Sequence, residues 1–463
     1  MAGSLLGTYD LQPSSKKATL QSNYLGSSDF DFMNQYLPDT MEKEFGRYGD
    51  RSITSFLRNM SAEIPSNSDL IKWSEEGRLH TKYVNVTSAA ALNADTAVLT
   101  VADAGITACN FRIGQTVFIS ANASSVANKA IITAVSGLTF TVAYYEAAGQ
   151  AFAAAAVVTC FVYGSEFKKG ANGMQGSLEA ETSIFEVSPI IIKDKFAISG
   201  SDMAQIGWIE VEGDNGMGYL WYLKSKHETR LRFEDYLEMM MVEHVEAEAG
   251  SGAIAVTGDV GNKGSQGLLS SIEERGNVWS GGVPSTLNDF DTVLNRLDKQ
   301  GAIAENTIFA NRTFSLNIDD MLAAQNSYGV GGTSFGLFDN DEQMALNLGF
   351  TGFRRGGYDF YKSDWKYLND ATLRGGLVGG VVNGVLVPAG STNVYDQVLG
   401  KNTTRPFLHV RYRETANENR KYKTWLTGSA GGAQTSDLDA MEVHFLSERA
   451  LCTLGANNFF IFK

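Results

Sequence analysis

Residues 218–249 read GYLWYLKSKHETRLRFEDYLEMMMVEHVEAEA, and this stretch has the pattern of one long helix. Its apolar residues recur at roughly helical spacing. They are Leu220, Leu223, Leu231, Phe233, Leu237, Met240, Met241 and Val245. Opposite charges four residues apart add support. These pairs are Lys224–Glu228, Glu228–Arg232 and Arg230–Glu234. The helix would be ~48 Å long, so we expect it to be a spine on which other elements pack.

The charges at the two ends of this helix oppose its dipole. Lys224 and Lys226 lie near its start, and three acidic residues crowd its end. Both placements disfavour the isolated helix, because a helix start is the positive end of the dipole. Two interpretations stay open: the acidic end is a solvated charge run, or it faces basic groups elsewhere, for example on a neighbouring subunit. On the second interpretation Glu243, Glu246 and Glu248 are interface residues.

The size and composition of the chain limit its class. At 463 residues it is too long for one compact core, so two or three structural units are expected. A formal net charge of -14 argues against a protein that wraps nucleic acid with a broad basic surface. The start of the chain lacks the pattern of an export signal. The most apolar stretch, residues 147–163, is too rich in alanine for a membrane span, so no membrane association is expected.

Few residues have the spacing of a catalytic or metal site. Cys109, Cys160 and Cys452 lack ligand spacing and are expected to be reduced and buried, although the first two could pair in space. The histidines include no pair four residues apart, and no HExxH motif occurs. Residues 332–336 have nucleophile-elbow spacing around Ser334, but the strand that this motif needs does not precede it. We therefore predict no metal, no cofactor and no catalytic residue, although catalytic groups can also converge from distant sequence positions.

Residues 87–162 form a segment of distinct composition. They carry few charges, and short β-prone runs rich in alanine, valine, isoleucine and threonine alternate with turns. The run at 131–142 is predicted to be a hairpin that turns at Ser136-Gly137. The sequence thus predicts a small all-β domain. The strand-like segments on either side, 79–86 and 184–198, look like two halves of one element into which this domain is inserted.

The remaining segments predict an α+β body. Residues 1–60 have few aliphatic side chains and are predicted to be an arm that a partner orders, with a short helix at 37–48. Thr286 and Asp289 resemble a capping box at the start of a further helix. Helices are expected at 287–300 and 315–325, and strands at 307–310, 407–414, 421–426, 441–446 and 459–462.

This order of elements resembles that of major capsid proteins of tailed double-stranded DNA phages, which share the Hong Kong 97-like fold. Three local stretches look similar to capsid proteins of crAss-like and related short-tailed phages. They are SEFKKG at residues 165–170, NGMQG at 172–176 and ENTIFAN at 305–311. The resemblance covers nearly the whole chain outside the β domain, and its motifs are architectural. It implies an α+β fold with a long spine helix, an extended loop, and the small all-β domain inserted in that loop.

The resemblance also divides the chain by position. The implied parts are an N-terminal arm at 1–60, an extended loop at 61–86 and 163–200, the inserted domain at 87–162, a peripheral domain at 201–285 and 406–463 with its spine helix at 218–249, and an axial domain at 286–405. The extended loop of such shells lies over a neighbouring subunit. Lys168 and Lys169 would then lie at an interface.

The function that this resemblance implies is structural, and on this ground the chain is not expected to be an enzyme. The chain would self-assemble into pentamers and hexamers of an icosahedral capsid, and would enclose packaged double-stranded DNA through weak, non-specific contact. Its other partners would be a separate scaffolding protein, a portal and accessory capsid proteins. It would be found in the virion, assembled in the host bacterial cytoplasm. Three alternatives stay open: an encapsulin-like nanocompartment shell, a protein that binds carbohydrate or an accessory protein through its β domain, and a hydrolase built on Ser334.

Overall fold

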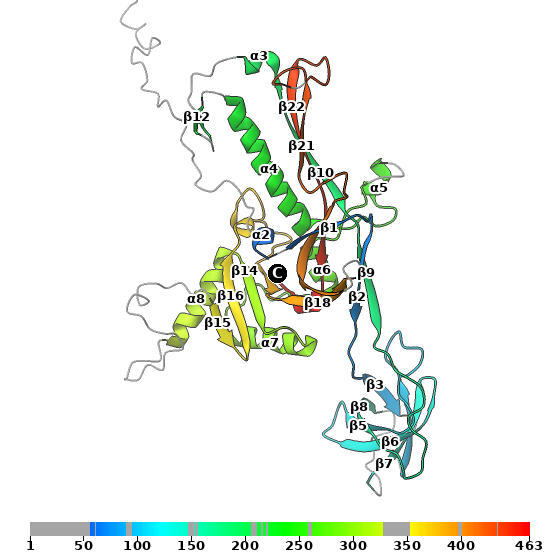
Figure 1. Ribbon diagram of the computed structural model, residues 1–463. Coiled ribbons are helices and arrows are strands. Elements are labelled where there is room, and N and C mark those ends of the chain that lie inside the picture. Colours follow the sequence, from blue (N-terminus) through cyan, green and yellow to red (C-terminus); the bar gives the residue numbers. More distant parts are fainter. Residues whose placement is uncertain are drawn as a thin grey trace, which may run out of the picture. The chain divides into compact units, whose positions relative to one another are not determined.

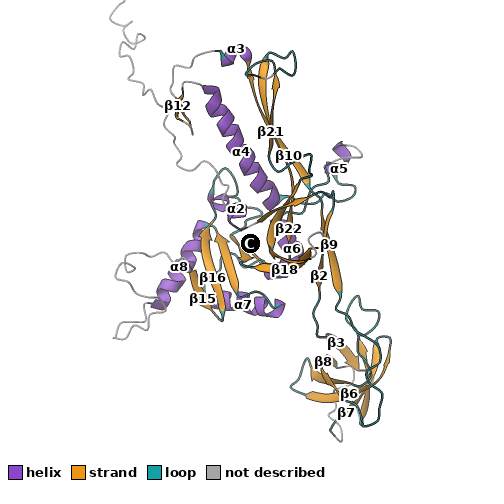
Figure 2. Ribbon diagram, in the orientation of Figure 1, coloured by secondary structure: helices purple, strands orange, loops and turns teal. Residues whose placement is uncertain are grey.

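The computed structural model describes residues 56–60, 62–88, 95–146, 152, 156–204, 211–213, 216–218, 221–257, 262–326, 352–396, 401–432 and 434–463. In these residues the chain is an α+β protein whose strands form a five-stranded sheet, a six-stranded sheet, a closed barrel and three two-stranded pairs (Figure 2). Most of the predicted arm, the helix predicted at 37–48 and the motif around Ser334 lie outside the described residues.

The contacts of the chain divide it into two units. The described parts of Lys193–Tyr236 and Lys423–Leu446 belong to one unit. Those of Thr54–Ile192, Leu237–Tyr422 and Ser447–Lys463 belong to the other.

The six-stranded sheet has the order β13-β23-β17-β14-β16-β15. Its strands are β13 (Asn277–Trp279), β14 (Glu305–Ala310), β15 (Gly352–Arg355), β16 (Tyr358–Asp364), β17 (Gly384–Pro388) and β23 (Phe460–Phe462). Helices α7 (Leu287–Gln300) and α8 (Arg312–Asn326) share one apolar core with this sheet, which includes Leu297, Ile308 and Phe460. Phe309 of β14 alternates to the other face, where its ring meets Phe56 at a centroid distance of 4.5 Å.

Helix α7 has the boundaries that the sequence predicts. The Thr286 side chain accepts a hydrogen bond from the Asp289 backbone N–H, and the Asp289 carboxylate accepts one from the Thr286 N–H, which completes the capping box. Gly301 ends the helix in the left-handed conformation, with a φ of 66°. Helix α8 begins three residues before the predicted position, because Asn311 Oδ1 accepts the Phe314 N–H at 2.8 Å and so caps the earlier turn.

The five-stranded sheet joins the late strands to earlier parts of the chain. Its strands are β1 (Ala62–Ser66), β10 (Ile190–Ser199), β20 (Leu408–Arg413), β21 (Lys423–Gly428) and β22 (Ala440–Thr453). The order is β1-β20-β22-β10, and β21 also pairs with β22. β22 continues to Thr453, well beyond the strand predicted at 441–446, because its second half pairs with β20.

A closed barrel is formed by six consecutive strands in the order β3-β4-β7-β6-β5-β8 (Figure 1). They are β3 (Lys82–Ser88), β4 (Thr96–Val101), β5 (Gln115–Ala121), β6 (Ala127–Ser136), β7 (Thr139–Tyr144) and β8 (Val157–Ser165). Alternate side chains point inward, so that Val86, Leu99, Ile119 and Phe140 are almost fully buried. The predicted hairpin is confirmed, with Ser136 and Thr139 paired across its turn.

The segments that flank the barrel pair differently from the prediction. β2 (Ile71–Glu76) and β9 (Thr182–Val187) form a two-stranded antiparallel ribbon, with Ile71 opposite Val187. The segment 79–86 was expected to form one element with 184–198, but most of it lies in β3 of the barrel. The reason is that Tyr83 and Val86 point into the barrel core, where they are 5% and 0% exposed.

The long helix is shorter than the sequence predicts. Helix α4 covers Trp221–Glu243 rather than 218–249. At its start, the strands β11 (Val211–Gly213) and β12 (Gly216–Gly218) pair with each other. At its end, the Gly267 N–H donates to the His244 carbonyl at 2.7 Å, and Glu246 forms a β-bridge with Gly264. The backbone after Glu243 therefore pairs with another segment instead of continuing the helix.

Short elements complete the described parts. They are α2 (Phe56–Met60), α3 (Gly200–Met203), α5 (Gly252–Thr257), α6 (Leu268–Arg275), α9 (Lys366–Asn369), η3 (Ala456–Asn458), β18 (Ser391–Asp396) and β19 (Lys401–Pro406). None of the described helices has the length and apolar character that crossing a membrane requires.

Candidate assembly surface

The β2–β9 ribbon presents apolar side chains to solvent. Ile184 is 70% exposed and Leu178, in the segment leading into β9, is 44% exposed. Leu79, between the ribbon and the barrel, is 88% exposed. Only the root of the ribbon is packed, since Ile71 and Val187 join a small core with residues of β22. A two-stranded ribbon is marginally stable in water by itself, so this surface is suited to contact with another protein.

The root of the ribbon is held by an arginine of helix α6. The Arg275 guanidinium lies over the Phe185 ring at 4.3 Å and over the Trp73 ring at 5.7 Å. Its Nη1 atom is 3.6 Å from the Glu75 carboxylate. Glu75 also accepts the Trp73 indole N–H at 2.9 Å and the Gly455 backbone N–H at 2.9 Å. Burial lowers the pKa of Arg275, and the Glu75 charge opposes this shift.

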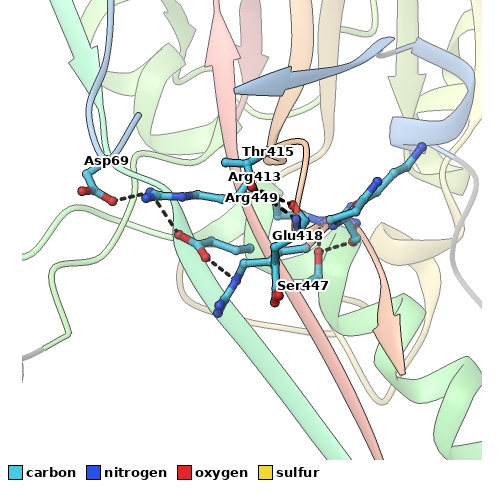
Figure 3. A network of polar contacts seen from close by, with 10 residues as sticks. Asp69, Arg413, Thr415, Glu418, Ser447 and Arg449 are labelled. Carbon is cyan, nitrogen blue, oxygen red and sulfur yellow. Dashed lines mark hydrogen bonds and ion pairs between the residues drawn. The ribbon is translucent and has the colours of Figure 1, made fainter. Parts of the chain in front are cut away.

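A second polar network reaches the segment that leads into the ribbon. Asp69, between β1 and β2, pairs with Arg413 of β20, as Figure 3 shows. Arg413 Nη1 also lies 3.6 Å from Glu448 Oε1, and Glu448 Oε2 lies 2.7 Å from Arg420 Nε. Glu448 is thereby shared by two arginines. The Asp69–Arg413 pair is thus a surface contact between the segment before β2 and strand β20.

Strand β1 is attached to the same network from its other side. Glu63 pairs with Lys421 and lies 3.7 Å from Arg449 Nη1. The buried Arg449 donates from Nε to the Ser447 hydroxyl at 2.9 Å and from Nη2 to the Lys421 carbonyl at 3.1 Å. Burial lowers the pKa of Arg449, while Glu63 acts to raise it. A buried arginine with these partners makes the junction of β1, β20 and β22 rigid.

Lys168 and Lys169, predicted as interface residues, are exposed on the loop between β8 and β9. The loop is fastened to the barrel on both sides of them. The Phe167 ring lies where a Cβ atom on Gly114 would be, at 2.5 Å from that position. Arg112 donates a hydrogen bond to the Gly176 carbonyl at 3.0 Å. The two ammonium groups are therefore presented from a loop whose ends are anchored on the barrel.

The three acidic interface candidates occupy different surroundings. Glu243 is the last residue of α4 and pairs with Arg374, whose Nη2 atom is 2.6 Å from Glu243 Oε2. It also accepts a hydrogen bond from the Tyr367 hydroxyl, and burial together with this carboxylate raises the pKa of Tyr367. Glu246 and Glu248 lie beyond the helix and are exposed. The basic group facing Glu243 thus comes from its own chain.

One group of side chains has the residue types of a catalytic triad. Thr427 Oγ1 is 2.7 Å from His444 Nε2, and Glu442 Oε2 is 3.5 Å from the same nitrogen. A serine-type triad needs the carboxylate on the opposite ring nitrogen, where it orients the base. The Lys195 ammonium also lies 3.0 Å from Glu442 Oε1. This geometry is that of a polar cluster on strands β10, β21 and β22.

His409 and the three cysteines, considered as catalytic residues or metal ligands, are buried in the fold. His409 is 2% exposed within β20. Cys109, Cys160 and Cys452 are buried and form no disulfide, and burial raises the pKa of Cys160 to about 12. Within the described part of the chain, no group of three or more His, Cys, Asp or Glu side chains is placed to hold a metal ion.

The chain is similar to known proteins among solved structures. No protein-family model matches the chain, and no curated protein does. A chain from Microbacterium phage Oxtober96 is 9% identical, with a TM-score of 0.41 over 95% of this chain and 99% of that chain. A chain from the asymmetric unit of the bacteriophage PhiM1 mature capsid is 8% identical, with a TM-score of 0.38 over 91% and 90%.

A further similar structure is a shell of another kind. A chain of the holo-SrpI encapsulin complex from Synechococcus elongatus PCC 7942 is 10% identical, with a TM-score of 0.33 over 61% of this chain and 77% of that chain. Phage capsid and encapsulin chains are therefore among the proteins to which this chain is similar.

Proposed function

We propose that the chain is a structural shell subunit with the Hong Kong 97-like fold, which assembles with copies of itself. The observation that carries this proposal is the β2–β9 ribbon, whose root is fixed and whose remaining length exposes apolar side chains. Leu79 and Ile184 gain free energy only when another surface covers them. A shell supplies that surface from a neighbouring copy.

In this proposal the copies form pentamers and hexamers of an icosahedral capsid that encloses double-stranded DNA. A chain of net charge -14 suits a container, because weak and non-specific contact with the contents is sufficient and counterions screen the repulsion. The ribbon and the barrel correspond to the extended loop and its insertion, and helix α4 to the spine. A separate scaffolding protein, a portal and accessory capsid proteins are the expected partners, and the virion is the expected location. Packaged enzymes in place of DNA would make the same shell an encapsulin-like compartment.

Replacing Ile184 with Asp tests the ribbon directly. We expect the fraction of chain in assembled particles to fall strongly, because a charged side chain cannot be buried in an apolar contact without a partner. The free energy of unfolding of the single chain should change by less than about 0.5 kcal/mol, because the Ile184 side chain is exposed. The two quantities are measured by sedimentation and by denaturant unfolding.

The matched control is Ile184→Val, which keeps the position apolar and should assemble as the unaltered chain does. Normal assembly of Ile184→Asp would show that the ribbon is not a contact surface, and would remove the support on which the proposal rests.

A further inference from the structure

The outer face of the barrel has a row of two aromatic rings between two lysines. The strand register places Lys82 opposite Phe161, Phe161 opposite Phe118, and Phe118 opposite Lys129. Residues directly opposite one another share one face of a sheet. The two ring centroids are 5.3 Å apart. Phe161 is 38% exposed, and Tyr163, two residues further along β8, is 50% exposed.

The positive charge of this row is not offset by an ion pair. Within the described residues, neither Lys82 nor Lys129 has an acidic partner. Two carboxylates of the same part of the chain are occupied by other donors. Asp103 accepts the backbone N–H groups of Val84 and Asn85, at 3.2 and 3.1 Å, and Glu166 accepts the Tyr145 hydroxyl at 2.6 Å. The row is therefore an aromatic strip with a lysine at each end, and neither lysine forms an ion pair within the described residues.

The complementary feature is the exposed acidic segment that follows helix α4. Glu246 and Glu248 are exposed and have no cationic partner in the described part of the chain. The backbone of the segment is fixed, because Glu246 bridges Gly264 and the Ala247 N–H donates to the Lys263 carbonyl at 2.8 Å. Glu248, two residues further on, begins the turn that the Ser251 N–H closes on the Glu248 carbonyl at 3.0 Å. The exposed carboxylates of Glu246 and Glu248 form the acidic face of this segment.

We propose that the Lys82–Phe161–Phe118–Lys129 row of one copy docks on the Glu246 and Glu248 face of a second copy. The row is about 14 Å long, and each ammonium sits on a flexible four-carbon stem that can lean inward to a carboxylate. Among the described residues neither surface has an ionic partner, which favours a contact between copies. The proposal rests on the shell function, and it names a specific contact for it.

Zero-length carbodiimide coupling tests the contact in particles assembled from a mixture of unlabelled and 15N-labelled chains. We expect cross-linked peptides that join Lys82 or Lys129 to Glu246 or Glu248, with one peptide labelled and the other unlabelled. Linked pairs in which both peptides always carry the same label would show a contact within one chain. Either that result or the absence of these pairs would overturn the proposal.

Charge reversal gives an independent readout. We expect Lys82→Glu with Lys129→Glu to raise the chain concentration needed for half-assembly at least about tenfold, because like charges would face one another. Adding Glu246→Lys and Glu248→Lys to that variant should restore assembly. Lys82→Arg with Lys129→Arg keeps both charges and serves as the matched control, with assembly unchanged.

The outcomes separate this proposal from the shell function. If the unaltered chain and the Lys82→Glu, Lys129→Glu variant form particles equally well, the docking proposal is wrong. The shell function would be unaffected by that result. If nuclease treatment disrupts the particles and nucleic acid is found to cover the row, the row binds nucleic acid. That result would overturn the proposal. Unaltered chains that never form particles would instead count against the shell function itself.

Discussion

Arg275 joins helix α6 to the ribbon through the flat face of its guanidinium group. The group lies on Phe185 and Trp73 and faces Glu75, so it contributes stacking, charge and packing at one point. An arginine suits this position better than a lysine, because only a planar cation can stack on two rings and still face a carboxylate. The ribbon is thereby attached to the body at its root.

Replacing Arg275 with Ala should lower the free energy of unfolding by about 2 kcal/mol, because the partly desolvated cation–π contact and the Glu75 interaction are both lost. Arg275→Lys keeps the charge without the planar stacking. Its free energy of unfolding should lie between those of the Ala variant and the unaltered chain. Denaturant unfolding measures the difference. An Ala variant as stable as the original chain would show that the stacking seen here contributes nothing.

Glu442 gives the molecule a pH dependence whose sign follows from its partners. The hydrogen bond from Lys195 lowers the pKa of Glu442, burial acts against this, and Thr427 and His444 add to the lowering. A carboxyl whose pKa is lower in the folded state stabilises the fold above its unfolded pKa, which is about 4.5. That contribution is lost as the pH falls through the lower, folded value.

Lys195→Gln should therefore reduce stability most above about pH 4.5, and the difference from the unaltered chain should shrink as the solution is acidified below that value. Denaturant midpoints between pH 3 and pH 7 provide the comparison. A difference that grew on acidification would contradict the role assigned to this pair.

Helix α7 shows how far one element can be determined by its ends. Thr286 and Asp289 satisfy each other's backbone N–H groups, and Gly301 adopts the left-handed conformation that ends the helix. Its inner face, which includes Phe290 and Leu297, belongs to the core of the six-stranded sheet.

Thr286→Ala should destabilise this part of the chain by about 1 kcal/mol, because the Asp289 N–H loses its side-chain acceptor at the start of the helix. Thr286→Ser retains the hydroxyl oxygen and is the control, with stability close to that of the unaltered chain. Hydrogen exchange of the first turn of α7 reports the change locally. Equal exchange in the Ala and Ser variants would mean that the side-chain cap has no energetic role.

Elements with local signals were predictable, and those that depend on distant pairing were not. The capping box predicted α7, and the alternation around Ser136-Gly137 predicted the β6–β7 hairpin. The ribbon was predicted only as one element on either side of the β domain; its pairing was not, since β2 rather than 79–86 pairs with β9 across the whole barrel and packs on β22 near the end of the chain. Helix α4 was predicted too long, because the pairing of Glu246 with Gly264 leaves no local mark in the sequence.

The same distinction applies to the candidate assembly surface. Lys168 and Lys169 were expected at an interface because of the resemblance to shell proteins, and the structure places them on an exposed loop whose ends are held on the barrel. Asp69 and Arg413 lie 344 residues apart, and neither belongs to a recognisable motif. Contacts of this kind arise from the sheet topology, which brings the two residues together only after β1 and β20 have paired.

At the scale of the whole molecule, the chain combines fixed attachments with uncovered apolar surface. The Arg275 stack holds the root of the ribbon, whereas Leu79 and Ile184 are left to solvent. A monomer gains nothing from this combination. Assembly would convert it into a contact surface that is already in place before the partner arrives.

The measurement that tests the shell function most directly is electron microscopy of the purified chain, expressed alone and together with the proteins encoded beside its gene. Closed shells, or rings of five and six subunits, are the predicted result, and the contents of the shells would then distinguish DNA from packaged protein. A chain that stays monomeric under both conditions would contradict the account, and would direct attention to ligand binding by the barrel.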